Sequence, residues 1–311
     1  MLNKKTLVYP QLPKAGLGNR LLVWARAILF AQMNDIPVIE PNWSNFSLGP
    51  YLRGESDKRY YRQFFDNKIY LSKINYWLAI LNRAQLHYNW EISQINPYDF
   101  SIKRKDHHVF IFNQLPHWSD LFRDLKNNQP LIKQKLFLTI KPDILKEIDK
   151  RSAPEIGVHI RRGDFKQLKV EDDFAKFGNA RTPLEWFITT IEAIRATARY
   201  NVPVTIFSDG YEQELFTILK LPEVKLAERA PSICDLLTLS KSKLLIASSG
   251  STFSSWASYL GQCPTLWHPA HFHSGVFGDD IGHLVYEGGY DPCSMFTPSL
   301  LVKNIEARFH Q

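Results

Sequence analysis

The sequence predicts an α/β fold in which helices cover both faces of parallel β-sheets. Three observations support this prediction. Short apolar segments alternate with helical segments from about residue 150 onward, the first residues show a strand, a glycine loop and a long helical segment, and small or charged polar residues directly follow the apolar segments. Alternation of this kind is typical of parallel sheets, which bind ligands outside the carboxyl ends of their strands.

The first half of the chain begins with a strand-like segment at 6–9, followed by the glycine-containing loop 14–19. The segment LLVWARAILFAQ at 21–32 is a strong helix candidate because it is long and almost entirely apolar. Strands are then expected at 36–39 and 109–112, and a helical stretch is expected at 131–150.

The second half shows the alternation most clearly. Strands are expected at 155–161, 202–207, 224–226, 243–247 and 264–267. Helices are expected to begin at Thr182-Pro183, near Tyr211, at Ser232 and at Ser251, because Ser and Thr favour the N-cap and Pro suits the first turn. With 311 residues the chain can form two domains. We place them at 1–150 and 151–311, with a return of the last helix to the N-terminal domain as an open alternative.

The composition indicates a globular chain with acidic partners. The formal net charge is +7 and the pI is near 9.1, which favours phosphates, nucleotides, nucleic acid or anionic membrane surfaces. No segment approaches the roughly 20 apolar residues of a membrane span, and no signal peptide is expected. Cys234, Cys263 and Cys293 show no paired spacing, which indicates a reducing compartment. We expect a cytoplasmic protein, with peripheral attachment to an anionic inner membrane as a further hypothesis.

The segment GVHIRRGDF at 157–165 places charged residues at the end of an apolar strand. Side chains alternate along a strand, so His159 and Arg161 are expected on one face and Arg162 on the other. A guanidinium at this position is suited to a phosphate, because it is always charged and forks around two oxygens. We favour that role for Arg161. For Arg162, an ion pair with Asp164 is an equal alternative.

Three further segments carry polar residues at comparable positions. The loop AGLGNRLL at 15–22 precedes a helix, where backbone amides of Gly16 and Gly18 can approach a polar ligand; the alternative is a tight turn capped by Asn19. Ser208 and Asp209 follow another strand, with an ordinary turn as the alternative. In the segment ASSGSTFSSWASYLG at 247–261, small hydroxyl residues open a helix and can bind an anion or merely cap it.

Several motifs are missing from the sequence. It contains no Walker loop, no GxSxG elbow, no HExxH segment and no acidic pair at a strand end that would hold a metal with a diphosphate. The histidines of HPAHFH at 268–273 lack the cysteines or helical spacing of a metal site. We therefore expect neither a metal nor a cofactor.

Together these segments resemble the inverting GDP-fucose-dependent fucosyltransferases. His159-Ile-Arg161-Arg162-Gly-Asp164 resembles their HxRRxD motif, and Gly16-Leu-Gly18-Asn19 resembles their G-x-G-N loop. In the α-1,2 branch, the Ser-Asp segment corresponds to Ser208-Asp209 and the S-T-F-S-x-W segment to Ser251-Thr252-Phe253-Ser254 with Trp256. The resemblance spans about residues 16–267.

The resemblance implies a GT-B fold, in which two Rossmann-like domains face a central cleft, the acceptor side first and the GDP-sugar side second. It implies metal-independent, inverting transfer of L-fucose from GDP-fucose to a hydroxyl of a glycan acceptor, with α-1,2 linkage in surface polysaccharide or oligosaccharide synthesis.

The same resemblance implies roles for individual residues. Arg161 would bind the β-phosphate and stabilise the departing GDP, and Asn19 would reach the fucose and acceptor. The catalytic base would be a carboxylate that follows the motif, with Asp164 and Asp172 as the expected catalytic residues and Glu171 and Asp173 as further candidates. The expected donor-binding residues are His159, Arg161, Arg162, Ser208, Asp209, Ser251, Thr252, Phe253, Gly16 and Gly18.

The chain departs from the family pattern at three positions. Gly210 stands where a second Asp is usual, Gly250 stands where Asn is usual, and Arg20 stands where Gln is common. These departures leave open another linkage such as α-1,6, or another nucleotide sugar. A polyanion- or nucleic-acid-binding protein is a third alternative, which the sequence disfavours because its arginines and aromatic residues form no single patch.

Overall fold

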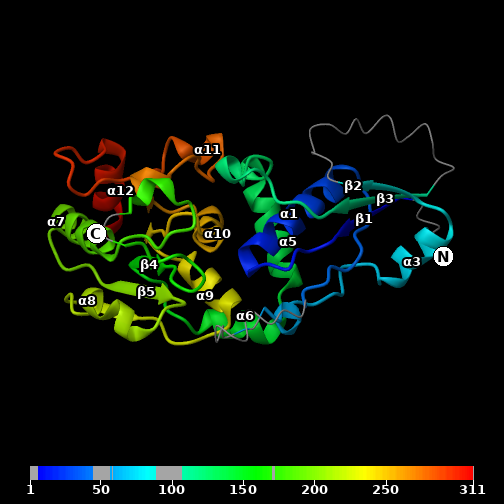
Figure 1. The fold of residues 1–311 in the computed structure, drawn as a ribbon, viewed down its shortest axis with the longest axis horizontal. Coiled ribbons are helices and arrows are strands. Elements are labelled where there is room, and N and C mark those ends of the chain that lie inside the picture. Colours follow the sequence, from blue (N-terminus) through cyan, green and yellow to red (C-terminus); the bar gives the residue numbers. More distant parts are fainter. Residues whose placement is uncertain (1–5, 45–56, 58, 89–106, 170–171, 311) are drawn as a thin grey trace. The chain divides into compact units, whose positions relative to one another are not determined.

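The computed structural model describes residues 6–44, 57, 59–88, 107–169 and 172–310. The chain divides into two units, residues 1–52 with 57–145 and residues 53–56 with 146–311. Each unit contains a parallel sheet with helices packed against it (Figure 1). The acceptor and donor roles that we assigned to 1–150 and 151–311 stay predictions.

The sheet of the first unit has three parallel strands in the order β1-β3-β2. They are β1 (Thr6–Pro10), β2 (Gln85–Tyr88) and β3 (His108–Phe112). All five residues of β3 are buried because this strand is central. The expected strand at 36–39 appears as two single bridges, Val8 to Val38 and Ile39 to Leu71.

The helices of the first unit differ from the prediction at their ends. Helix α1 (Leu17–Met33) begins at Leu17, so Gly18 and Asn19 lie in its first turn and not in a loop. The stretch 131–150 is two helices, because Ile140 adopts an extended conformation and Pro142 begins the second one. The helices are α1, α3 (Ile74–Leu81), α5 (Gln129–Thr139) and α6 (Pro142–Asp149), with 3-10 turns η1 (Tyr61–Gln63), η3 (Trp118–Asp120) and η4 (Lys126–Asn128).

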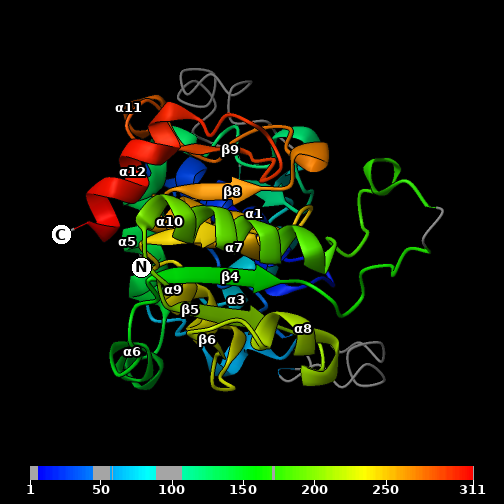
Figure 2. The same cartoon turned by 90° about the vertical axis from the view of Figure 1, so that its left-hand side faces the viewer.

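The sheet of the second unit has six parallel strands in the order β6-β5-β4-β7-β8-β9. They are β4 (Ile156–Ile160), β5 (Val204–Ser208), β6 (Val224–Leu226), β7 (Leu244–Ile246), β8 (Thr265–Trp267) and β9 (Glu287–Gly289). Their arrowheads point the same way in Figure 2. Counted along this unit the order is that of a Rossmann sheet, and it reverses between β4 and β7. The carboxyl ends of these two strands are therefore where such a fold binds its ligand.

Helices cover both faces of this sheet, as the sequence predicts. The helices are α7 (Leu184–Ala198), α8 (Phe216–Leu219), α9 (Ser232–Leu239), α10 (Thr252–Gly261), α11 (Asp279–Gly282) and α12 (Ser299–Phe309), with 3-10 turns η5 (Phe174–Lys176), η6 (Glu212–Leu215) and η7 (Pro269–His271). Helices α7 and α12 pack against each other on one face (Figure 2). Helix α9 lies on the other face, where Leu239 and Ser242 approach the strand at Gly157.

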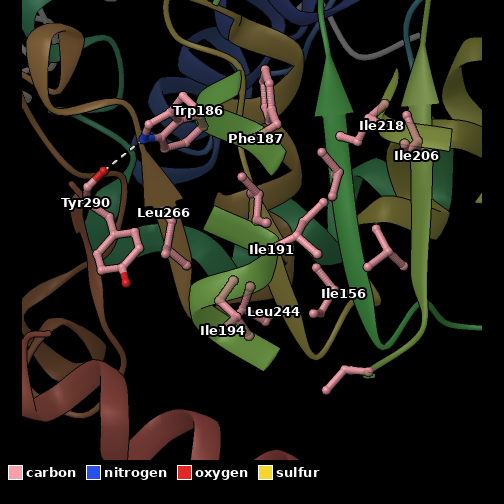
Figure 3. Packing of buried hydrophobic residues seen from close by; sticks show 14 of the residues in the cluster. Ile156, Trp186, Phe187, Ile191, Ile194, Ile206, Ile218, Leu244, Leu266 and Tyr290 are labelled. Carbon is pink, nitrogen blue, oxygen red and sulfur yellow. Dashed lines mark hydrogen bonds between the residues drawn. The ribbon is translucent and has the colours of Figure 1, made fainter. Parts of the chain in front are cut away.

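The core of the second unit joins α7 and α12 to the strands. Phe187, Ile191 and Ile194 of α7 pack with strand residues such as Ile156 and Leu244 (Figure 3). The indole Nε1–H of Trp186 donates a hydrogen bond of 2.9 Å to the carbonyl of Tyr290, which links α7 to the segment after β9. Leu301, Ile305 and Phe309 of α12 belong to the same core. The last helix therefore lies with the second unit.

None of the helices in the described part of the chain has the length and apolar character needed to cross a bilayer.

Candidate functional site

The candidate site lies where β4 ends, beside the point at which the strand order reverses. The alternation along β4 is continued into the segment that follows it. His159 contacts α10, on one face of the sheet, whereas the side chain of Arg162 reaches the residues before α7, on the other face. The prediction that His159 and Arg162 point to opposite faces is confirmed.

His159 is buried against the start of α10. Its Nδ1 atom lies 2.7 Å from the hydroxyl of Ser254, and its ring stacks on Phe253 with centroids 4.8 Å apart. Burial, with a smaller contribution from the positive charge of Arg161, lowers the pKa of His159 to about 3. The imidazole is therefore neutral at physiological pH and can serve as a hydrogen-bonding group, but not as a cation.

Ser248 connects the ends of β4 and β7. Its hydroxyl donates to the carbonyl of His159 at 2.8 Å and accepts from the backbone N–H of Arg161 at 2.8 Å. The backbone N–H of Ser248 donates to the hydroxyl of Ser254 at 3.2 Å. This buried network holds the backbone on either side of Arg161 at the strand end.

The guanidinium of Arg161 lies between two carboxylates. Nη2 donates to Oδ1 of Asp164 at 2.5 Å, and Nη1 pairs with Oδ2 of Asp209. The guanidinium also lies over the ring of Phe165, 5.6 Å from its centroid. The Arg161 side chain is 25% exposed, so it remains accessible from solvent. The ion pair that we expected as an alternative for Arg162 is thus formed by Arg161.

Arg162 has a structural position. It is buried, and its Nη1 donates to the carbonyl of Thr182 at 3.1 Å. Burial lowers its pKa, and the neighbouring Arg181 lowers it further. Arg181 donates from Nε to the carbonyl of Arg162 at 3.2 Å and from Nη1 to Glu214 at 2.7 Å. The side chain of Arg162 is therefore enclosed on the face opposite to His159, and the prediction that it binds the donor has no geometric support.

Ser208 and Asp209 tie β5 to the end of β4. The hydroxyl of Ser208 donates to the carbonyl of Ile160 at 2.7 Å, and Oδ1 of Asp209 accepts from the backbone N–H of Arg162 at 2.7 Å. Since the other oxygen of Asp209 pairs with Arg161, this carboxylate positions the guanidinium. Gly210 follows because a Cβ there would lie 2.7 Å from Cγ of Arg162. That close approach is the physical reason why the usual second Asp is replaced.

The N-terminus of α10 lies next in the site. The hydroxyl of Ser251 accepts from the backbone N–H of Ser254 at 3.4 Å, so Ser251 is the N-cap and Thr252 the first helical residue. Gly250 has a φ of +65°, a left-handed conformation that Gly and Asn adopt most readily. A Cβ at this position would also lie 2.6 Å from the carbonyl oxygen of Gly178. Both features explain why Gly can replace the usual Asn here.

Other predicted residues have contacts of their own elsewhere. Asp172 accepts from the backbone N–H of Lys169 at 3.1 Å, in the segment after β4 that projects from the sheet in Figure 2. Asp173 caps η5, where it accepts from Ala175 at 3.1 Å. These contacts do not bring Asp172 to Arg161. The further candidate at position 171 lies outside the described residues.

Gly16, Gly18 and Asn19 belong to the first unit. Gly16 is the N-cap of α1, so Asn19 does not cap this helix as the alternative interpretation proposed. Arg20 is fully buried and donates to the carbonyls of Ala15, at 3.0 Å, and of Trp43. Arg20 thereby anchors the start of α1.

The histidines at 268–273 form an aromatic cluster. The ring of Phe174 contacts the rings of His268 and His271, with centroids 4.7 and 4.1 Å apart. Burial, with a contribution from His271, lowers the pKa of His268 to about 4. Among the described residues, no three or more His, Cys, Asp or Glu side chains are grouped so that they could hold a metal ion.

Four residues of the site were missing from the predicted set. Ser248 and Ser254 form the network described above, and the hydroxyl of Thr182 accepts from the backbone N–H of Ser249 at 3.1 Å. Thr182 therefore does not cap α7, whose N-cap is Pro183. The hydroxyl of Ser249 is buried and has no hydrogen-bond partner within the described part of the chain. A cluster of small hydroxyl residues after an apolar strand is the signal that points to these positions.

The sequence was compared with known families and with solved structures. The family described as Glycosyl transferase family 11 matches residues 70–267, which is more than half of the chain. The chain belongs to glycosyl transferase family 11. It is therefore a glycosyltransferase, and the family resemblance inferred from the motifs is confirmed. A comparison with curated proteins finds no match.

Two solved structures show the fold of this family 11 glycosyltransferase. The apo form of POFUT1 covers 85% of this chain and 97% of its own length, at 11% identity and a TM-score of 0.53. POFUT1 in complex with GDP covers 85% of this chain and 98% of its own length, at 12% identity and a TM-score of 0.52. This likeness confirms the prediction of an α/β fold of the GT-B class.

Proposed function

We propose that this glycosyltransferase moves L-fucose from GDP-fucose to a hydroxyl of a glycan acceptor, with inversion at the anomeric carbon and without a metal. An α-1,2 linkage in surface polysaccharide or oligosaccharide synthesis is the first candidate, because the Ser-Asp and S-T-F-S segments resemble that branch. An α-1,6 linkage or another nucleotide sugar is the second candidate, because Gly210 and Gly250 depart from the α-1,2 pattern.

The position of Arg161 carries this proposal. Its guanidinium follows β4 beside the reversal of strand order, where a Rossmann sheet binds a nucleotide. A guanidinium has five N–H donors, and the ion pairs with Asp164 and Asp209 use one from each Nη atom. The remaining donors suit the oxygens of a diphosphate. POFUT1, which shares this fold, is known in complex with GDP.

The start of α10 supports a diphosphate as the ligand. The N-terminus of a helix favours an anion because its first N–H groups are unpaired within the helix and its dipole is positive there. Ser251 and Thr252 occupy this position, and the buried hydroxyl of Ser249 lacks a partner among the described residues. We assign these three hydroxyls, with the neutral imidazole of His159 and the ring of Phe253, to the donor.

In the proposed reaction, the bond between the anomeric carbon and the β-phosphate oxygen breaks, and its electron pair leaves with GDP. Arg161 stabilises the negative charge that grows on the diphosphate. The acceptor oxygen bonds to the anomeric carbon from the opposite face, and its proton passes to a carboxylate base. Asp164 and Asp172 are the candidates for this base. Asn19, Gly16 and Gly18 of the first unit remain predicted substrate-binding residues.

The test is a calorimetric titration of the full chain with GDP, UDP and dTDP in the presence of EDTA, repeated on Arg161→Ala. We expect selective binding of GDP that is lost in the variant. Arg199→Ala is the matched control, since Arg199 is an exposed arginine at the C-terminus of α7, and it should bind GDP as the unmodified protein does. No preference for GDP, or equal binding by Arg161→Ala, would contradict the proposal.

A further inference from the structure

Helix α3 of the first unit is apolar on both of its faces. Its buried face packs on the sheet through Ala79 and Tyr76, which join a core that includes Val109 of β3. Tyr76 also contacts the ring of Tyr9 in β1, with centroids 4.9 Å apart. Asn75 is the only side chain of this helix that carries an amide, and none of its side chains is charged. A helix that is apolar all round is usually enclosed by protein or by lipid.

The outer face of α3 is nevertheless exposed. Ile74, Trp77, Leu78 and Leu81 are 65, 62, 50 and 78% exposed, and they follow one another at the spacing that places side chains on one side of a helix. Leu86 and Tyr88 of the adjoining strand β2 are also exposed. Figure 1 shows α3 at the periphery of the first unit. We refer to these six side chains as the α3 patch.

The charge around the α3 patch has one sign. From Asn67 to Tyr88 the sequence contains Lys68, Lys73 and Arg83 but no Asp or Glu. Lys73 directly precedes α3 and Arg83 follows it closely, and neither takes part in an ion pair with the described residues. Long basic side chains at the ends of an exposed apolar helix are placed to keep their charges in water while the helix contacts an apolar phase.

The helix is held firmly against its unit. The carboxylate of Glu40 accepts from the backbone N–H of Lys73 at 3.1 Å and from the amide of Asn67 at 2.9 Å. The exposed side chains are therefore presented by a helix that is fixed at its N-terminus and packed on the sheet.

We propose that the α3 patch docks on a membrane surface that carries anionic headgroups. An amphipathic surface helix with Trp and Leu on its apolar side and basic residues beside it lies in the boundary between headgroups and acyl chains, and Trp and Tyr favour that boundary. Juxtaposed Lys and Arg are attracted to anionic lipid. The charge argues against a second copy of the chain as the occupant. In a two-fold dimer the same patch would meet itself and bring Lys73 and Arg83 close to their counterparts.

The docking is tested by co-sedimentation of the full chain with vesicles of phosphatidylcholine alone and of phosphatidylcholine mixed with phosphatidylglycerol. We expect binding to the mixed vesicles that weakens as salt screens the charges. Trp77→Ala with Leu81→Ala keeps helix propensity but removes two apolar anchors, so binding should weaken about tenfold or more. Phe296→Ala is the matched control, because Phe296 is an 82% exposed aromatic residue of the second unit, and it should bind as the unmodified protein does.

A second variant separates charge from apolar contact. Lys73→Gln with Arg83→Asn should weaken binding to the mixed vesicles by about fivefold for each charge removed and leave binding to pure phosphatidylcholine unchanged. Asn suits position 83 because the φ of Arg83 is +57°. Thermal unfolding and GDP titration of every variant check the fold and the donor site independently.

Three results would overturn the proposal: no binding of the unmodified protein to either vesicle, equal binding by the Trp77 and Leu81 variant, or a dimer in solution that this variant dissociates. The last result would assign the patch to a second copy of the chain. Loss of GDP binding alone would concern only the proposed transferase reaction.

Discussion

The hydroxyl of Ser248 accepts a hydrogen bond from the backbone N–H of Arg161 at 2.8 Å. The pairing of β4 with β7 ends at Val158 and Ile246, so this side chain takes over where the strand ladder stops. Since the same hydroxyl donates to the carbonyl of His159, it satisfies backbone groups on both sides of residue 160. The position of Arg161 thus depends on a serine that is 87 residues away in sequence.

Replacement of Ser248 by Ala should destabilise the second unit. Ser248 is 1% exposed, and its loss leaves the N–H of Arg161 and the carbonyl of His159 without this partner. A buried polar group left without a partner costs about 1–3 kcal/mol. Urea unfolding measures the change. Ser255→Ala is the control, since Ser255 is only half-buried and should change the unfolding free energy by less than about 0.5 kcal/mol. Equal effects of the two substitutions would contradict the role of Ser248.

The strands and their carboxyl ends could be predicted from local sequence, because short apolar segments bounded by polar residues are enough to locate them. Arg161, Asp209 and Ser251 were therefore placed near one another correctly. The ion pair of Arg161 with Asp209 could not be predicted, because it requires β5 to lie beside β4. The same holds for Ser248, whose contacts require β7 on the other side of β4.

Helix ends were predicted less well where glycine or proline stands at them. Gly16 and Gly18 suggested a loop, yet α1 already begins at Leu17, because Gly18 is buried in its first turn. Thr182 suggested an N-cap, but its hydroxyl accepts from Ser249 instead. In each case a tertiary contact overrides the local preference.

Arg161 and Arg162 are neighbours in sequence and should respond differently to the same substitution. Arg161→Met removes the cation that stabilises the leaving diphosphate, so the transfer rate should fall by about 100-fold or more. Because Asp164 and Asp209 are each about a third exposed, the unfolding free energy should change by less than about 1 kcal/mol.

Arg162→Met is the control for that experiment. It leaves the buried carbonyl of Thr182 without its donor, so the unfolding free energy should fall by about 1–3 kcal/mol. Thermal unfolding and initial rates measure both effects. A variant at position 161 that is destabilised more than the variant at position 162 would assign the structural role to the wrong arginine.

Gly210→Asp restores the residue that is usual in the α-1,2 branch, yet it should impair this chain. Its Cβ would lie 2.7 Å from Cγ and 3.0 Å from Cβ of Arg162, atoms close to the backbone that cannot move aside freely. Overpacking of this kind costs about 1–3 kcal/mol. Gly210→Ala introduces the same Cβ without the charge and serves as the comparison. If both variants unfold like the original protein, the close approach of Arg162 does not explain the glycine.

His159 should make the stability of the protein depend on pH in the mildly acidic range. Its folded pKa is lowered to about 3 from an unfolded value near 6.5, so between these values the unfolded chain binds more protons. The contribution is fully present above about pH 6.5 and decreases as pH falls. His159→Asn keeps an N–H donor near Ser254 but cannot titrate. The variant should therefore be less stable at pH 7, where the packing on Phe253 is lost, but the difference should shrink by about 2 kcal/mol at pH 5. Urea unfolding at both pH values measures it. The lowered pKa of His268 affects both proteins equally and cancels in the comparison. A difference that stays constant between the two pH values would show that His159 does not titrate as its buried position requires.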